Sequence, residues 1–134
     1  DLQSRTNRDL PLPAVSEKIR ASAGGTVILP CHISHSVDIP TVEWSKEGLD
    51  PNIIFLYQHG CDTFEMKNQV FQFRTNLIMN KVKDGDISLH MFICSCLIPE
   101  LYQCRVFWER NPETCGYFLL LPSIYSYKPQ CWVC

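Results

Sequence analysis

Cysteine content limits what this chain can fold into more than any other feature, because eight of its 134 residues are cysteines. An even and high count favours disulfide bonds and an oxidising compartment outside the cell. The alternative is a reduced protein with buried or metal-bound thiols, but no tight array of metal ligands accompanies the cysteines. Spacing alone does not fix which cysteines pair.

Length and charge narrow the class of protein further. The chain has the length of one domain, and 46% apolar residues are enough for a hydrophobic core. Charged residues make up 19% and the formal net charge is −2, so there is no basic stripe to support nucleic-acid binding. The apolar run at 116–121 is far too short to span a bilayer. The chain starts without Met or a leader, so we expect a removed signal peptide or a fragment.

Apolar residues recur with a period of two in several short segments, and no segment shows a convincing helical period. This patterning predicts an all-β fold of two packed sheets. Asp84 and Gly85 form an Asp-Gly pair that signals a hairpin. Pro30 lies inside a strand-like run, so its position must face an edge, a bulge or solvent. The strand-like segments are TVILPC (26–31), TVEWSKEG (41–48), IIFLYQHG (53–60), VFQFRTN (70–76), ISLHM (87–91) and YQCRVF (102–107).

Cys31, Trp44 and Cys104 follow one another in an order typical of immunoglobulin sandwiches, and Tyr102 lies two residues before the second cysteine. The chain resembles a V-set immunoglobulin domain of the butyrophilin and myelin-oligodendrocyte-glycoprotein type over about residues 14 to 108. The segments that carry the resemblance are GGTVILPC (24–31), VEW (42–44), FLYQHG (55–60), FRTNL (73–77), DGDISL (84–89) and YQC (102–104).

The resemblance implies an immunoglobulin V-type two-sheet sandwich. In that fold a Cys31–Cys104 disulfide joins the sheets, Trp44 packs on it, and the Tyr102 hydroxyl ties the corner before its strand. Such a bridge stabilises by roughly 4 kcal/mol in the chain-entropy model. We expect a leader or linker at 1–13, the domain at 14–121, and an atypical tail at 122–134 whose order is left open.

The sequence departs from the family pattern in three places. Ile98 replaces the Asp that normally pairs with the arginine at position 74, and we predict that Glu100 substitutes for it. Cys94 and Cys96 replace aliphatic residues, and Cys94 is predicted to be a small buried hydrophobe. After Trp108 the usual small-residue bulge of the last strand is absent, although CGYFLLLP (115–122) can supply a strand. An alternative splice or a misassigned gene model would explain the altered corner and the tail.

Metal binding and catalysis find little support. The pairs Cys94-x-Cys96 and Cys131-x-x-Cys134 and the group Cys31, His32 and His35 do not form the paired spacings of a structural zinc site. Four histidines, at positions 32, 35, 59 and 90, have no catalytic motif around them. We therefore predict no metal, no cofactor, no catalytic residue and no small-molecule substrate.

The pairing of the remaining cysteines stays open. Cys61 and Cys115 fall in loops at the same end of a V-type sandwich, so a bridge between them competes with free or intermolecular thiols. Cys131 and Cys134 are close enough in sequence to close a small local loop.

One sheet face is the candidate surface for a protein partner. If Tyr102 and Cys104 point inward, their neighbours point outward, and an arginine beside aromatic residues is typical of an interface. An ordinary solvated face is the alternative. The residues predicted on this face are Glu43, Ser45, Tyr57, Gln103, Arg105 and Phe107.

Function follows from the resemblance alone. It implies an extracellular recognition module, on the external side of the plasma membrane or secreted, that modulates T-cell responses by binding a counter-receptor on another cell. Membrane attachment would need an anchor absent from this chain. The alternative is a homophilic adhesion domain that self-associates through the same face.

Overall fold

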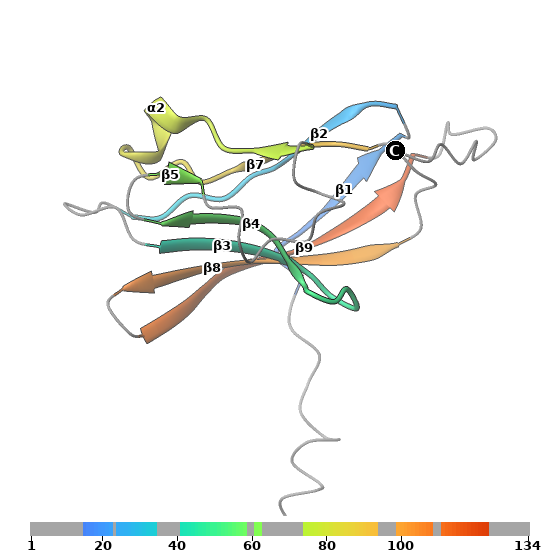
Figure 1. Cartoon of the computed structure of the whole chain (residues 1–134). Coiled ribbons are helices and arrows are strands. Elements are labelled where there is room, and N and C mark those ends of the chain that lie inside the picture. The colour runs from blue at the N-terminus through green and yellow to red at the C-terminus, as the bar shows by residue number, and fades with distance from the viewer. Residues whose placement is uncertain are drawn as a thin grey trace, which may run out of the picture.

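Two β-sheets lie face to face in the computed structural model of the chain (Figure 1). The structure describes residues 15–22, 24–34, 41–58, 61–62, 74–93, 99–108 and 111–123. The larger sheet has six strands in the order β1-β9-β8-β3-β4-β5 and the smaller sheet has three in the order β2-β7-β6. The larger sheet consists of β1 (Glu17–Ala21), β3 (Thr41–Lys46), β4 (Ile53–Gln58), β5 (Cys61–Asp62), β8 (Glu100–Trp108) and β9 (Asn111–Pro122). The smaller sheet consists of β2 (Thr26–Leu29), β6 (Thr75–Asn76) and β7 (Leu89–Phe92).

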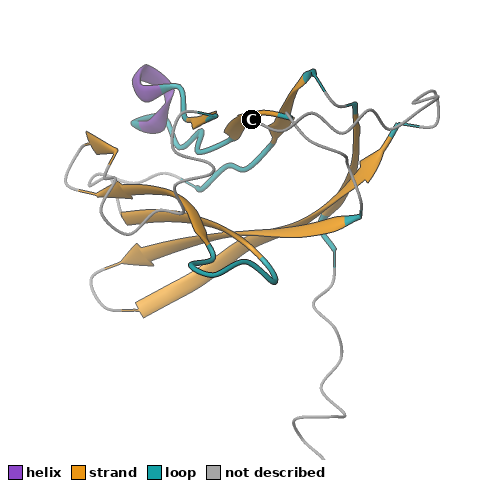
Figure 2. Cartoon of the chain, turned by 45° about the vertical axis from the view of Figure 1, so that its right-hand side comes forward, coloured by secondary structure: helices purple, strands orange, loops and turns teal. Residues whose placement is uncertain are grey.

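Strand pairing is antiparallel throughout these sheets except at one edge, where β1 runs parallel to β9. Strands dominate the described residues, as the view coloured by secondary structure shows (Figure 2). The predicted all-β sandwich of two sheets is therefore confirmed. Pro30 follows the last residue of β2 and is exposed, a position where its missing N–H costs no ladder bond.

One local expectation was wrong. Asp84 and Gly85 do not form a hairpin between adjacent strands: they follow a four-residue helix, α2 (Met79–Val82), within the connection from β6 to β7. Gly85 nevertheless has a φ of +91°, a conformation that glycine adopts without strain. The strand that CGYFLLLP (115–122) was expected to supply is present within β9, which pairs with β8 on one side and with β1 on the other.

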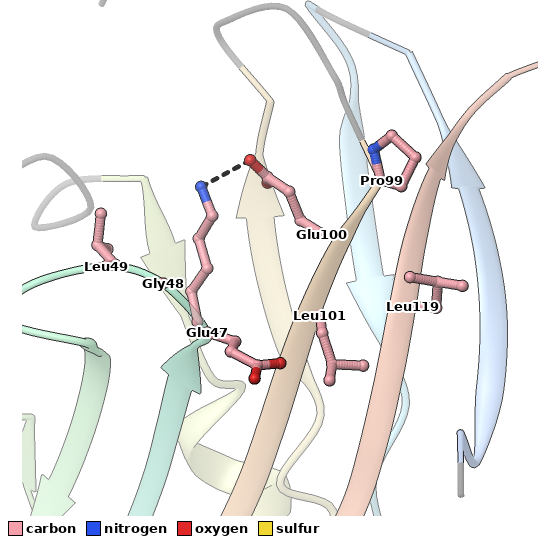
Figure 3. Close-up of a pocket in the computed structure, with 8 residues that line it drawn as sticks. Glu47, Gly48, Leu49, Pro99, Glu100, Leu101 and Leu119 are labelled. Carbon is pink, nitrogen blue, oxygen red and sulfur yellow. Dashed lines mark ion pairs between the residues drawn. The ribbon is translucent and has the colours of Figure 1, made fainter. Parts of the chain in front are cut away.

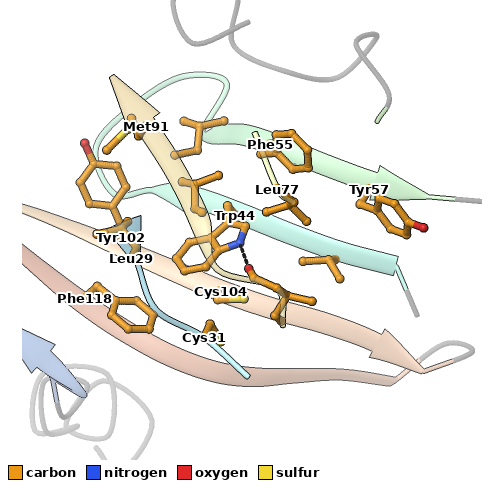
Figure 4. Packing of buried hydrophobic residues seen from close by; sticks show 14 of the residues in the cluster. Leu29, Cys31, Trp44, Phe55, Tyr57, Leu77, Met91, Tyr102, Cys104 and Phe118 are labelled. Atoms are coloured by element: carbon orange, nitrogen blue, oxygen red, sulfur yellow. Dashed lines mark hydrogen bonds between the residues drawn. The ribbon is translucent and has the colours of Figure 1, made fainter. Parts of the chain in front are cut away.

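The core lies between the sheets and is built by alternate residues. In β8 the buried residues are Tyr102, Cys104 and Val106, which confirms the predicted inward parity. Figure 4 shows aromatic and aliphatic side chains from both sheets meeting around Trp44. Each fully buried side chain of this size contributes about 1.5–3 kcal/mol of hydrophobic stabilisation.

Several predictions fall outside the described residues. They concern the leader at 1–13, the histidines at 35 and 59, the segment 63–73, and most of the tail, 124–134. The cysteines at 94, 96, 131 and 134, the residue at 98, and the side chain at 61 also lie there.

Candidate protein-binding face

Cys31 and Cys104 come together in the core, as the resemblance predicts. Cys31 lies two residues after the end of β2, on the side of the smaller sheet, and Cys104 is fully buried in β8 of the larger sheet (Figure 4). Both are thiols in the structure, and their side chains interact. Burial raises the pKa of the Cys104 thiol well above its ordinary value. The covalent bond between them stays a prediction.

Trp44 occupies the centre of the sandwich. Its side chain has no exposed surface, and its indole Nε1 donates a hydrogen bond of 3.0 Å to the carbonyl oxygen of Ile87. The Phe118 ring packs against it with a centroid distance of 5.3 Å and an interplanar angle of 40°, a tilted arrangement that aromatic pairs prefer. The single polar group of the indole is thus satisfied inside an apolar core.

Tyr102 ties the start of β8 through a side chain rather than through the backbone. Its hydroxyl donates to Oε2 of Glu100 at 3.1 Å, and Oε1 of Glu100 pairs with Lys46 Nζ at 2.8 Å. This ion pair borders a pocket of about 470 Å³ (Figure 3). Burial, and then the charge of Glu100, raise the pKa of Tyr102, so the phenol stays protonated and keeps donating.

Glu100 was predicted to replace the family's aspartate as the partner of Arg74. The ion pair that the structure gives Glu100 is with Lys46. Arg74 donates from Nη1 to the Phe92 carbonyl at 3.0 Å. Burial lowers the pKa of Arg74, and the charge of Glu100 partly opposes that effect. Glu100 therefore acts on Arg74 by charge while bonding directly to Tyr102 and Lys46.

Replacing Glu100 with alanine should destabilise the domain by about 1.5–3 kcal/mol, because it removes the acceptor of a buried hydroxyl and the partner of a mostly buried ammonium. Urea unfolding measures this as a lower midpoint. Glu47→Ala is the matched control, since Glu47 is exposed, and a surface change of this kind shifts stability by less than about 0.5 kcal/mol. Equal midpoints for the two variants would show that the contacts of Glu100 with Tyr102 and Lys46 do not stabilise the domain.

Arg105 is the centre of the outer face of the larger sheet. Its guanidinium donates from Nε to Oε1 of Glu43 at 3.1 Å, and Nη2 contacts the same oxygen. The guanidinium carbon also lies 5.3 Å from the centroid of the Phe107 ring, within the range of a cation–π interaction. Glu43 and Phe107 together fix the direction of this arginine.

Gln103 continues the outer face toward the other end of β8. Its Nε2 donates to Oγ1 of Thr114 and to the hydroxyl of Tyr117, each at 3.1 Å. Next to it lies a groove of about 180 Å³ with mixed polar and apolar walls. The residues lining this groove are Ser45, Glu47, Asn52, Leu101, Gln103 and Tyr117.

The six predicted face residues do not all reach the surface. Gln103, Arg105 and Phe107 are partly exposed, whereas Glu43 is 7% exposed and Ser45 is 4% exposed. Glu43 therefore positions Arg105 and offers little area of its own.

Tyr57 was predicted on the outer face, and the structure packs it in the core with 4% exposure. The cause is register: Tyr57 lies opposite Val42, whose side chain points inward. Leu56 lies opposite Glu43 and takes the outward position from β4. The pairing of Leu101 with Leu119 and of Gln103 with Tyr117 adds outward residues that were not predicted, because the sequence analysis assigned no register to the strand after Trp108.

The described part of the chain contains no group of three or more histidine, cysteine, aspartate or glutamate residues arranged to hold a metal ion. Its helical residues also include no segment long and apolar enough to cross a membrane.

The model of the immunoglobulin domain family matches residues 18–87, just over half of the chain. The chain belongs to the immunoglobulin domain family. The match covers Cys31 and Trp44. The strands that follow residue 87 belong to the same two sheets. No curated protein is significantly similar to this immunoglobulin domain in sequence.

Solved structures share the fold at low sequence identity. The IgV-like domain of human B7-H4 matches with a TM-score of 0.67 and 18% identity, over 81% of this chain and 92% of that one. Bovine butyrophilin matches with a TM-score of 0.67 and 20% identity, over 83% of this chain and 51% of that one. A chain from the complex of ICOS with ICOS-L and an anti ICOS-L VNAR domain matches with a TM-score of 0.70 and 17% identity, over 81% and 56%. This immunoglobulin domain thus spans about half of the latter two chains.

Proposed function

We propose that this immunoglobulin domain is an extracellular, non-enzymatic recognition module of a butyrophilin-like protein of the V-set type. It acts on the external side of the plasma membrane or as a secreted protein. It modulates T-cell responses by binding a receptor on another cell. The neighbours named B7-H4, butyrophilin and ICOS with ICOS-L are consistent with this class of protein.

The observation that carries the proposal is the preorganised Arg105. Glu43 and Phe107 hold the guanidinium in one direction before any partner arrives, which reduces the side-chain entropy that binding must remove. The Arg105 side chain keeps 34% of its surface exposed, so a carbonyl or carboxylate of the partner can reach the guanidinium. Arginine and aromatic residues are also the residue types enriched among interface hot spots.

Binding should depend on Phe107 and Arg105 and not on a more exposed aromatic residue on the opposite sheet. A fluorescent tetramer of the domain, titrated on activated T cells, measures the apparent affinity. Phe107→Ala and Arg105→Ala should each weaken staining by about 30-fold, the effect of removing a hot spot of about 2 kcal/mol. Phe92→Ala is the matched control, because Phe92 is 43% exposed on β7 of the opposite sheet.

Two outcomes would redirect the proposal. If both variants stain as the parent does, the outer face around Arg105 is not the binding surface. If the domain stains no cells but forms a dimer in sedimentation that strengthens with concentration and is lost in Phe107→Ala, homophilic adhesion is the function. Circular dichroism of each variant verifies that the sheets are intact.

A further inference from the structure

A third cysteine is aimed at the Cys31 and Cys104 pair by a bulge in β9. Gly116 lies opposite Cys104 and Thr114 lies opposite Arg105, so Cys115 is the extra residue between them. A bulge of this kind redirects a side chain out of the normal alternation. Cys115 accordingly packs against the core cluster that contains the other two cysteines.

Cys31 lies between the other two cysteines in the network of thiol contacts. Its thiol interacts with both Cys104 and Cys115. Its backbone is held in place, since the Cys31 carbonyl accepts from the Ile87 amide at 2.9 Å and the Cys31 amide donates to Oγ of Ser88 at 3.0 Å. Exchange of a disulfide partner requires one sulfur that two other sulfurs can reach, and Cys31 is placed to meet this requirement.

Cys115 differs from the other two in its access to solvent. Cys31 is 5% exposed and Cys104 is fully buried, whereas Cys115 is partly exposed. It borders a groove of about 230 Å³ together with residues that directly follow Cys31. The other residues lining the groove are His32, Ile33, Ser34, Trp108, Glu113 and Thr114.

We propose that Cys31 forms a disulfide with either Cys104 or Cys115, and that the two bonds interchange within the folded domain. In the exchange the Cys115 thiolate forms a bond to Sγ of Cys31. The Cys31–Cys104 bond breaks, and Cys104 leaves as a thiolate that takes up a proton. The number of disulfides is unchanged, so no oxidant or reductant is consumed. This inference rests on the predicted Cys31–Cys104 bond and not on the proposed function.

The exchange should be slow at neutral pH and speed up in alkali. While Cys31 is a free thiol, burial, and then the charges of Cys31 and Glu113, raise the pKa of Cys115 to about 11, against a lowering contribution from the Val106 backbone. Once Cys31 is bonded to Cys104 its thiolate charge is absent, and burial together with Glu113 still holds the pKa of Cys115 above its ordinary value. Cys104 and His32 also lie beside this group. Below that pKa the thiolate fraction rises tenfold per pH unit, and the rate of attack follows it.

The test maps disulfides in the secreted, oxidised full chain. Protein held at pH 5 is shifted to pH 7, 8 or 9, quenched in acid, alkylated and digested without reduction. We expect the 31–115 linked peptide to appear about tenfold faster for each pH unit. Cys115→Ser is the matched control and should show the 31–104 bond at every pH.

Cys104→Ser provides a second readout, since Cys31 should then bond to Cys115. The proposal is overturned if wild type at pH 9 yields no 31–115 peptide, whether or not Cys104→Ser folds. It is also overturned if Cys115 is found bonded to Cys104 instead, because the shared sulfur would then not be that of Cys31.

Discussion

Replacing Trp44 with alanine is expected to destabilise the domain by about 5 kcal/mol. Deleting a fully buried tryptophan costs about 3–5 kcal/mol through lost transfer energy and the cavity that remains. The carbonyl of Ile87 also loses its indole donor, and a buried acceptor without a partner costs about 1–3 kcal/mol more. Because a domain of this size has a total stability of only about 5–15 kcal/mol, this loss is a third of it or more, and the variant should unfold at a much lower urea concentration.

Urea unfolding followed by circular dichroism measures this loss. Trp44→Phe keeps most of the packing and removes the hydrogen bond, so it should lie between the parent and the alanine variant. Trp108→Ala is the control for loss of an indole, since Trp108 is only partly buried near the end of β8. Equal losses in Trp44→Ala and Trp108→Ala would contradict the central role of Trp44.

Reducing the predicted Cys31–Cys104 bond is expected to cost about 2–5 kcal/mol, mainly because the unfolded chain regains the freedom that a long closed loop denies it. The measurement compares unfolding free energies of oxidised and reduced protein in a Cys115→Ser background, where only this pairing of the three neighbouring thiols remains. A Cys31→Ala and Cys104→Ala double variant in the same background should show no such gap. Peptide mapping that finds Cys31 and Cys104 unlinked in secreted protein would remove the basis of the expectation.

Sequence reasoning worked where a residue type has few alternatives. Two cysteines and a tryptophan in that order are typical of immunoglobulin sandwiches, and the structure brings the three residues together. The parity of β8 was readable because polar and apolar residues alternate there. These two signals were enough to predict the two-sheet fold and half of the candidate face.

The failures have physical causes. β4 has apolar residues on both parities, so its pattern could not tell Tyr57 from Leu56, and its register shifts at a bulge beside Trp44. The bulge that redirects Cys115 exists only once β9 is paired with β8. Register and bulges depend on how two strands pair, and the sequence of one strand alone does not show that pairing.

The parallel pairing of β1 with β9 has a mechanical consequence. Glu17 lies opposite Phe118 and Ala21 lies opposite Pro122, so the first and last described strands run side by side in the same direction. A pull on the chain before β1 and after β9 is directed along these strands and strains their interstrand bonds together instead of one after another. Tension applied to this immunoglobulin domain through the two ends of its chain therefore loads the β1–β9 pair in shear, and the hydrogen bonds between these strands must break together.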